Sequence, residues 1–517
     1  MSLILETLLA HSINKKDSIA LQSGKYTVTY GALSTLVINF SKYLVSKDVK
    51  TLGFQLDNSF AWAVVDLAAT HAGINIVPIP VFFTEKQCEH IIETAKIDFL
   101  ICGFPLHLGE EWQAHSLFDD SWNDNTQLVP SIFDSRIKFF RRPIKEPIDY
   151  SGVKITFTSG SSGQPKGVCL SHEAIETVAA SIVNALRQFE IETHLCVLPL
   201  ATLLENIAGF YAPLIKGIVI HMPSLDVVGL SGASLDVEKF SSIINEVDPN
   251  SIILVPQLLT AIVTLKQFQL ISADKFKMMA VGGGRVSEHL IGSAEELGLP
   301  VCQGYGLSEC CSVLTLNLAS ADKPNSVGKA LPHVKLRLSA EGEIEASGSN
   351  MLGYLGQSEK MNEWYATGDL GYIDDDGFVY ITGRKKNVFI TSFGRNVNPE
   401  WVESALTQQA AISQAIVYGE GRDHNLALIW LRFPQNETEI QSLLTKANSE
   451  LPDYAQAGAY VVIEEALAGV YLTANGRIKR EPVLAHFQNY IDEHYALATK
   501  HPNSIEYDRV SAARYTK

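Results

Sequence analysis

The chain has few cysteines, and none of them has the spacing of a shared site. Its 517 residues include seven cysteines, with no CxxC pair and no histidine at a linked spacing. Because disulfide frameworks and zinc sites show such spacings, we expect reduced, mostly buried thiols and neither of these structures. The isolated histidines His172, His194 and His333 are interpreted as ordinary structural or surface residues.

Positive charge and long hydrophobic runs are also scarce. The 41 lysines and arginines are outnumbered by 57 aspartates and glutamates, which leaves a formal net charge of −16. A nucleic-acid-binding role would need a basic face and is therefore disfavoured. The apolar stretches are interrupted within a few residues, so we expect no transmembrane helix. Residues 1–6 lack the features of a signal peptide, which predicts a cytoplasmic location. Peripheral membrane contact during substrate capture stays open, although no basic amphipathic helix supports it.

Short apolar runs alternate with amphipathic segments from about residue 50 to 310. The runs lie at 51–55, 74–78, 99–102, 193–198, 218–221 and 277–281, and helical patterns such as 174–189 and 287–297 lie between them. This alternation predicts parallel sheets that are covered by helices on both faces. Residues 326–382 show short strands with Gly and Asp turns, which predicts a small β-rich subdomain. We therefore predict a large N-terminal α/β domain over residues 1–383 and a small α+β domain over residues 384–517.

The most informative segment is 158–167, Thr-Ser-Gly-Ser-Ser-Gly-Gln-Pro-Lys-Gly. It follows the β-branched run 153–158, which predicts a buried strand. Glycines let backbone N–H groups converge on an anion, hydroxyls add donors, and Lys166 adds a full charge. The segment is not a Walker A motif, because its lysine lies between Pro165 and Gly167 instead of leading straight into a helix. We interpret it as a phosphate-binding loop, and a flexible Ser/Gly turn is the alternative.

Four further segments carry chemically active residues in a fixed order along the chain. They are 303–309 (QGYGLSE), which follows a predicted strand at 300–302, then 364–369 (WYATGD), 383–400 (GRKKNVFITSFGRNVNPE) and 472–480 (LTANGRIKR). The first places an aromatic, a hydroxyl and a carboxylate on one tight turn. The second ends a predicted strand with Asp369, an acid of the kind that accepts hydrogen bonds from ribose. Each segment alone is commonly a turn, a strand end or a basic surface, but the set is hard to obtain by chance.

This order of motifs resembles the adenylate-forming superfamily of acyl-CoA synthetases, peptide-synthetase adenylation domains and luciferases. The resemblance covers residues 30–484. Within the superfamily, the segments 198–205 (LPLATLLE), 303–309 and 383–399 are most similar to those of the long-chain acyl-CoA synthetases.

The resemblance implies a reaction in two halves. A carboxylate attacks the α-phosphate of ATP to give acyl-AMP and pyrophosphate, and the thiol of coenzyme A then takes the acyl group. Because the first half pushes one anion onto another, positioned cations and N–H donors are what lower its barrier. The implied ligands are ATP, Mg²⁺, coenzyme A and a medium- to long-chain fatty or similar apolar carboxylic acid. Nucleic acid is not among them, and the oligomeric state stays open.

The resemblance also implies the site residues. The catalytic residues would be Lys166, Glu309, Arg477 and Lys386. The residues that would cradle the β- and γ-phosphates are Thr158, Ser159, Gly160, Ser161, Ser162, Gly163 and Lys166. Magnesium would be held by Thr158 and Glu309. The other residues of the nucleotide and acyl-adenylate site would be Gly283, Gly284, Gln303, Gly304, Tyr305, Gly306, Ser308, Asp369, Arg384 and Gly394. Among these, Tyr305 would stack on adenine, Ser308 would contact the α-phosphate, and Asp369, with Arg384, would bind the ribose.

The family's C-terminal domain rotates between the two half-reactions, about a residue that corresponds here to Lys386. One face would bring Arg477 to the adenylation step. The other would bring the loop 387–396, whose Gly394 would leave a narrow path for a pantetheine arm. The rotation also excludes water from a hydrolysable intermediate. An exposed linker lysine is the alternative interpretation of Lys386.

Two positions depart from the family's pattern. Arg477 stands where the family has its catalytic lysine, and Thr202 stands where the LPLAHxxE segment has histidine. Arginine keeps the charge but is a bulkier, planar group, and Lys479 is a weak substitute for it. Three functions therefore stay open: an acyl-CoA synthetase, an acyl-adenylate ligase that transfers to an amine or a carrier-protein thiol, and a catalytically idle adenylate-binding protein. Thr202 leaves the length of the acyl chain open.

Overall fold

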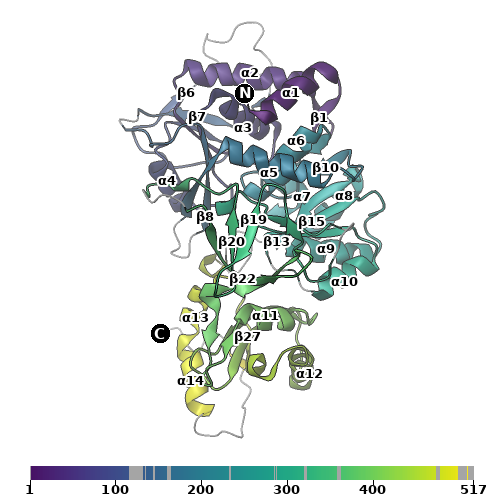
Figure 1. Ribbon diagram of the computed structural model, residues 1–517. Coiled ribbons are helices and arrows are strands. Elements are labelled where there is room, and N and C mark those ends of the chain that lie inside the picture. The colour runs from purple at the N-terminus through teal and green to yellow at the C-terminus, as the bar shows by residue number, and fades with distance from the viewer. Residues whose placement is uncertain are drawn as a thin grey trace. The chain divides into compact units, whose positions relative to one another are not determined.

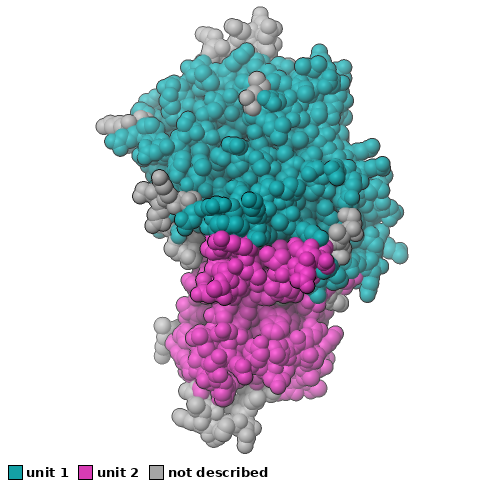
Figure 2. Space-filling view, in the orientation of Figure 1, with its two compact units in different colours: residues 1–284, 294–336, 346–365 teal, residues 285–293, 337–345, 366–517 magenta. Residues whose placement is uncertain are grey.

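The computed structural model describes residues 2–115, 132–133, 136–143, 146–159, 165–231, 234–284, 286, 288–318, 323–357, 362–467, 469–472, 478–498 and 509–510. The chain divides into two compact units (Figure 2). Unit 1 comprises residues 1–284, 294–336 and 346–365, and unit 2 comprises residues 285–293, 337–345 and 366–517. Unit 2 thus takes in part of the predicted β-rich subdomain, and the domain boundary at residues 383/384 stays a prediction.

The first large sheet of unit 1 has nine strands in the order β18-β17-β16-β15-β14-β10-β11-β1-β2. Its parallel strands are β16 (Val301–Tyr305), β15 (Met278–Val281), β14 (Ser251–Leu254), β10 (Thr193–Leu195), β11 (Val219–His221) and β1 (Ile19–Ser23). Antiparallel strands form its edges: β2 (Tyr26–Thr29), β17 (Thr315–Leu316) and β18 (Lys329–Ala330). The predicted strands at 193–198, 218–221 and 277–281 are therefore confirmed, with β10 shorter than its apolar run.

The second large sheet has eight strands in the order β21-β9-β8-β4-β3-β5-β7-β6. Its parallel centre consists of β8 (Val153–Ser159), β4 (Asn75–Pro78), β3 (Thr51–Gln55) and β5 (Phe99–Cys102). Antiparallel neighbours complete it: β9 (Pro165–Ser171), β21 (Gly353–Tyr354), β7 (Lys138–Arg141) and β6 (Gln113–His115). Every residue of β3, β4 and β5 is buried, because helices cover both faces of the sheet.

Ten α-helices lie between residues 3 and 296 in the described part of the chain, and α2 and α3 pack side by side (Figure 1). They are α1 (Leu3–Asn14), α2 (Tyr30–Ser46), α3 (Phe60–Ala72), α4 (Glu85–Thr94), α5 (His172–Ala185), α6 (Ala212–Lys216), α7 (Leu225–Val228), α8 (Val237–Val247), α9 (Pro256–Gln267) and α10 (Glu288–Glu296). Thr29, Ser59 and Ser171 begin α2, α3 and α5, where each side-chain oxygen accepts a backbone N–H of the first turn. These caps satisfy donors that have no partner within the helix.

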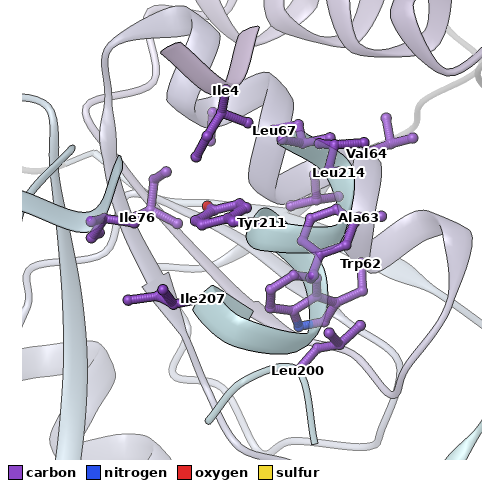
Figure 3. Close-up of a cluster of buried hydrophobic side chains, with 14 of the residues drawn as sticks. Ile4, Trp62, Ala63, Val64, Leu67, Ile76, Leu200, Ile207, Tyr211 and Leu214 are labelled. Atoms are coloured by element: carbon purple, nitrogen blue, oxygen red, sulfur yellow. The ribbon is translucent and has the colours of Figure 1, made fainter. Parts of the chain in front are cut away.

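One hydrophobic core combines residues of both large sheets. Within it, the fully buried indole of Trp62 lies edge-on to Phe54 and to Phe210. Around it, Figure 3 shows Tyr211 and Leu214, which belong to the π-helix η3 (Glu205–Tyr211) and to α6. The segment that follows β10 is thus enclosed by the core and not exposed at the surface.

A four-stranded sheet in the order β19-β20-β22-β23 forms the predicted β-rich part. Its strands are β19 (Lys335–Leu338), β20 (Glu343–Ser347), β22 (Tyr365–Ile373) and β23 (Val379–Arg384). The rest of unit 2 contains the short hairpin of β24 (Phe389–Ile390) and β25 (Asn396–Val397). A second four-stranded sheet consists of β26 (Ile412–Tyr418), β27 (Asn425–Leu431), β28 (Ala457–Ile463) and β29 (Arg509–Val510).

Alternate residues of this last sheet pack against different helices. Ala427 and Ile429 contribute to a core with α11 (Pro399–Thr407) and α12 (Glu437–Asn448). Leu426 and Leu428 contribute to another with α13 (Arg480–His486) and α14 (Gln488–Ala498). This period of two is the side-chain alternation of a strand. The predicted fold class, a large parallel-sheet α/β part followed by a smaller α+β part, is confirmed.

Disulfides and membrane-spanning helices can be checked in the described residues. All seven cysteines are free and buried, so the structure contains no disulfide among them. Among the helices of the described ranges, none has both the length and the apolar character needed to cross a bilayer.

Candidate active site

The predicted phosphate-binding loop connects two antiparallel strands. In the β8–β9 hairpin, Thr158 lies directly opposite Lys166. Directly opposed residues of an antiparallel pair project from the same face, so these two side chains share one side of the hairpin mouth. Thr158 is half-buried and Lys166 is exposed. The residues Gly160, Ser161, Ser162 and Gly163, and the side chain of Ser159, lie outside the described residues.

The segment 303–309 is only partly the tight turn that the sequence predicted. Gln303, Gly304 and Tyr305 belong to β16, which is longer than the expected strand because β17 pairs with its end. Ser308 and Glu309 lie in a 3₁₀ turn, η4 (Ser308–Cys310). Between them, a Cβ on Gly306 would lie 1.6 Å from the carbonyl oxygen of Ser312. Glycine is therefore required for the chain to fold back at this point.

The glycines 282–284 lie at the same edge as this segment. They follow β15, whose Val281 pairs in parallel with Gln303 of β16. A Cβ on Gly282 would lie 3.5 Å from the carbonyl oxygen of Gly304, and Gly283 has a φ of 72°. Gly283 and Gly284 thus lie near the Gln303–Gly306 segment at the carboxyl ends of neighbouring parallel strands. Ligands of open α/β sheets bind at such edges.

Tyr354 connects the hairpin to η4, and the sequence motifs did not identify it. Its strand β21 pairs with β9, which places its ring 5.7 Å from Lys166 Nζ, within cation–π range. Its hydroxyl donates a 3.0 Å hydrogen bond to Glu309 Oε1 and lies 3.4 Å from the hydroxyl of Tyr365. Burial raises the pKa of both tyrosines, with a contribution from the Glu309 charge, so both phenols stay protonated near neutral pH. Lys166 and Glu309, 143 positions apart, are therefore brought to one aromatic side chain.

Two of the predicted residues carry oxygen atoms of the kind that Mg²⁺ prefers. The Glu309 carboxylate and the Thr158 hydroxyl are hard donors, and Lys166, opposite Thr158, contacts the same tyrosine as Glu309. Magnesium in nucleotide sites is commonly held by one or two such groups together with phosphates and waters. The residues therefore fit a Mg²⁺–ATP complex.

Tyr354→Phe tests the bond to Glu309. A hydrogen bond to a charged group contributes about 1.5–3 kcal/mol, so we expect the magnesium concentration for half-maximal activity to rise about ten-fold. The phenylalanine ring keeps the contact with Lys166, so the KM for ATP should change less. Tyr26→Phe, at an exposed tyrosine of unit 1, is the matched control. An unchanged magnesium dependence would show that Tyr354 does not position Glu309.

Asp369 lies in the middle of β22 and does not end a strand, contrary to the sequence prediction. The ladder continues because Asp369 pairs directly with Arg384 of β23. The carboxylate is 5% exposed and its Oδ1 lies 2.7 Å from Arg384 Nε. Arg384 also donates from Nη1 to the carbonyl oxygen of Thr367. The predicted partnership of Asp369 and Arg384 is thus present within unit 2.

The remaining predicted residues also belong to unit 2. Lys386 is exposed in the 3₁₀ turn η6 (Lys385–Asn387), next to Lys385, which pairs with Glu341 and Glu343. Gly394 has a φ of 70°, a left-handed backbone conformation that favours glycine. A Cβ atom at this position would meet no other atom, so crowding is not the reason for the glycine. Arg477 lies outside the described residues. Lys479, its weak substitute, occupies the N-cap position of α13.

Comparison with known proteins gives matches to two family models and to curated relatives. A family described as "AMP-binding enzyme" matches residues 10–355, and the "AMP-binding enzyme C-terminal domain" matches residues 386–499. The 2-succinylbenzoate–CoA ligase of Bacillus subtilis (strain 168) is 25% identical over 434 residues, 80% of this chain and 77% of that protein. The long-chain-fatty-acid–CoA ligase ACSBG2 of Gallus gallus is 24% identical, over 90% of this chain and 76% of that protein.

Solved structures share the fold. The o-succinylbenzoate CoA synthetase of Bacillus subtilis, in complex with its acyl-adenylate intermediate, has a TM-score of 0.72 at 21% identity, over 92% of this chain and 97% of that chain. The anthranilate CoA ligase AuaEII, in complex with anthranoyl-AMP, has a TM-score of 0.76 at 18% identity, over 94% of this chain and 97% of that chain. The match to the first family model spans more than half of the chain and confirms the resemblance inferred from the motifs. The chain belongs to the family of AMP-binding enzymes.

Proposed function

We propose that this protein is an AMP-forming acid–CoA ligase that works through an acyl-adenylate. The observation that carries the proposal is the convergence of Lys166, Tyr354 and Glu309, which come from distant parts of the chain. A cation beside a carboxylate at the mouth of a glycine–hydroxyl loop suits a magnesium-bound triphosphate. The CoA ligases among the relatives supply the second support.

The proposal assigns roles to the main residues of the predicted site. The loop 158–167, with the charge of Lys166, binds the β- and γ-phosphates, which become the pyrophosphate leaving group. Glu309 and Thr158 would hold Mg²⁺, which would supply positive charge opposite the phosphates. Tyr305 holds adenine, and Asp369 with Arg384 holds the ribose. These interactions place the α-phosphorus for attack by the substrate carboxylate, so catalysis is positioning and electrostatic stabilisation.

The C-terminal residues belong to the same proposal. Lys386 is the point about which the domain that starts at residue 384 rotates between the two half-reactions. Arg477 serves the adenylation step, and Gly394 borders the path of the pantetheine arm. An exposed Lys386 in a short turn suits a point where the backbone changes direction.

For the acid, we propose a medium- to long-chain fatty or similar apolar carboxylate. The segment 198–205 supports this choice by its similarity to the long-chain synthetases, and several relatives are named as long-chain-fatty-acid–CoA ligases. Other relatives are named for 2-succinylbenzoate, which carries an aromatic ring. Hydrocarbon affinity grows by about 0.8 kcal/mol for each buried CH₂, so the depth of the acyl pocket sets the preferred acid. The proposal also includes a cytoplasmic location for the protein.

The test is a panel of carboxylic acids assayed for AMP release with and without coenzyme A. The panel contains saturated fatty acids of increasing length, benzoate and 2-succinylbenzoate. We expect AMP release that depends on an apolar acid and on CoA, together with an acyl-CoA product. Acyl-AMP that yields a hydroxamate with hydroxylamine but never acyl-CoA would support transfer to an amine or carrier protein instead. Absence of carboxylate-dependent ATP–pyrophosphate exchange would support the third function, a catalytically idle adenylate-binding protein.

A further inference from the structure

Three side chains with metal-binding atoms meet in the interior of unit 1. They are His194 of β10, Cys196 directly after β10, and Glu205 at the start of the π-helix η3. One ligand atom of each lies within 4.8 Å of the other two. His194 is 1% exposed, and Cys196 and Glu205 are fully buried. Neither the phosphate site nor the ribose pair uses any of them.

The hydrogen bonds around His194 favour one tautomer of its imidazole ring. Nδ1 lies 2.9 Å from Ser251 Oγ, and that hydroxyl donates its only proton to the carbonyl oxygen of Thr193. Both contacts of Ser251 are hydrogen bonds at once when Nδ1–H of the histidine donates to Ser251 Oγ. In the neutral ring, Nε2 then has a bare lone pair. This is the state in which a histidine binds a metal ion, with the other nitrogen held by a second partner.

Most polar atoms of the cluster have no hydrogen-bond partner. These are His194 Nε2 and both carboxylate oxygens of Glu205. His194 Nε2 and Glu205 Oε1 are 3.6 Å apart, too far for a hydrogen bond between them. Cys196 Sγ lies 3.4 Å from the carbonyl oxygen of Gly209, a weak hydrogen bond, and it also interacts with the Glu205 carboxylate. Buried polar atoms are rarely left unpaired in native proteins, so three of them around one point indicate a ligand.

The backbone around the three side chains leaves room between them. Residues 205–211 form a π-helix, a rare conformation that is found frequently at functional sites. A Cβ on Gly209 would lie 2.7 Å from Glu205 Oε1 and 3.0 Å from His194 Nε2. Any larger residue at 209 would therefore crowd both potential ligands.

We propose that His194, Cys196 and Glu205 bind a Zn²⁺ ion that fixes the π-helix to strand β10. A nitrogen, a sulfur and a carboxylate oxygen are all zinc ligands, and sites with three protein ligands leave a fourth position for water. A thiolate and a carboxylate neutralise the two charges of zinc, and the neutral imidazole adds none. The bound site is then neutral overall, as an apolar interior requires. This site is independent of the proposed ligase activity.

The proposal departs from the sequence analysis, which expected no zinc site and an ordinary His194. The ligands show a His-x-Cys pair and a glutamate nine positions later, a spacing unlike that of the zinc motifs. They meet only because η3 packs back onto the end of β10.

Metal content of the purified full-length protein tests the site. After expression with added zinc, we expect about one zinc per chain, and Cys196→Ser should lose at least about ten-fold in zinc occupancy or affinity. Cys88→Ser, which changes another buried cysteine, is the matched control and should keep its zinc. Gly209→Ala keeps all three ligands and should lower zinc affinity by crowding them. Removal of zinc by a chelator should lower the melting temperature of the wild-type protein and not that of Cys196→Ser.

X-ray absorption on the wild-type protein keeps the proposal testable if Cys196→Ser does not fold. We expect one sulfur at about 2.3 Å and nitrogen or oxygen neighbours at about 2.0–2.2 Å from the zinc. Substoichiometric zinc in the wild-type protein even after incubation with the metal, full zinc in Cys196→Ser, or a zinc shell without sulfur would each overturn the proposal.

Discussion

Lys166→Met and Glu309→Gln should each lower carboxylate-dependent pyrophosphate release by about 10²–10³-fold, the loss typical for removal of one group that stabilises a transition state electrostatically. Methionine keeps the length of the lysine side chain but removes the charge opposite the phosphates. Glutamine keeps the size of Glu309 but removes the negative charge that suits Mg²⁺. Because both groups meet at Tyr354, the structure predicts that the two losses are not additive. Single-turnover formation of acyl-AMP measures the effect directly.

Lys277→Met is the matched control, since Lys277 is another exposed lysine of unit 1. It should release pyrophosphate at the rate of the unaltered protein. Melting temperatures within about 2 °C of that protein would show that Lys166→Met and Glu309→Gln fold normally, as expected for positions that are not fully buried. Near-normal pyrophosphate release in either variant would contradict the proposed site.

The largest stability effect is expected at Lys154, the second residue of β8, whose side chain is buried. Its Nζ lies 2.7 Å from Asp66 Oδ1, 2.6 Å from Asn206 Oδ1 and 2.7 Å from the hydroxyl of Tyr211. Tyr211 in turn donates a hydrogen bond to Asp66. Burial lowers the pKa of Lys154, and the Asp66 charge acts in the opposite direction. The cluster joins the second sheet to α3 and to η3.

Lys154→Met should destabilise unit 1 by about 3–5 kcal/mol, because it leaves Asp66 charged and without its cation in the core. We expect a decrease in melting temperature of roughly 5–10 °C, measured by calorimetry on the full chain. Lys277→Met serves again as the control and should melt with the unaltered protein.

The double variant Lys154→Met/Asp66→Leu distinguishes two contributions to stability: the destabilisation by an unpaired buried charge and the stabilisation by the ion pair itself. Replacement of both partners by apolar groups should recover most of the lost stability. A Lys154→Met protein that melts within about 1 °C of the unaltered one would contradict the assigned role of the ion pair. So would a double variant that is less stable than the single one.

Much of the strand pattern was predictable from the sequence. The runs at 51–55 and 99–102 match β3 and β5 in full, because every residue of these strands is buried and the sequence is correspondingly apolar. The end of β16 was not predictable, because its last residues join the strand only through pairing with β17. Asp369 was misplaced for the same reason, since its ladder partner Arg384 lies 15 positions away in the chain.

The sequence by itself determined the family of this protein and predicted a phosphate-binding loop. A loop such as 158–167 carries its glycines, hydroxyls and lysine within ten residues, so the chemistry is readable without a fold. Only the tertiary structure showed that Tyr354 contacts both Lys166 and Glu309. The ion pair of Lys154 with Asp66 and the cluster of His194, Cys196 and Glu205 are likewise contacts between residues that the sequence did not connect. Local periodicity reports which face of a strand or helix is buried. It does not report which distant residue lies opposite, because strand order and packing create that proximity.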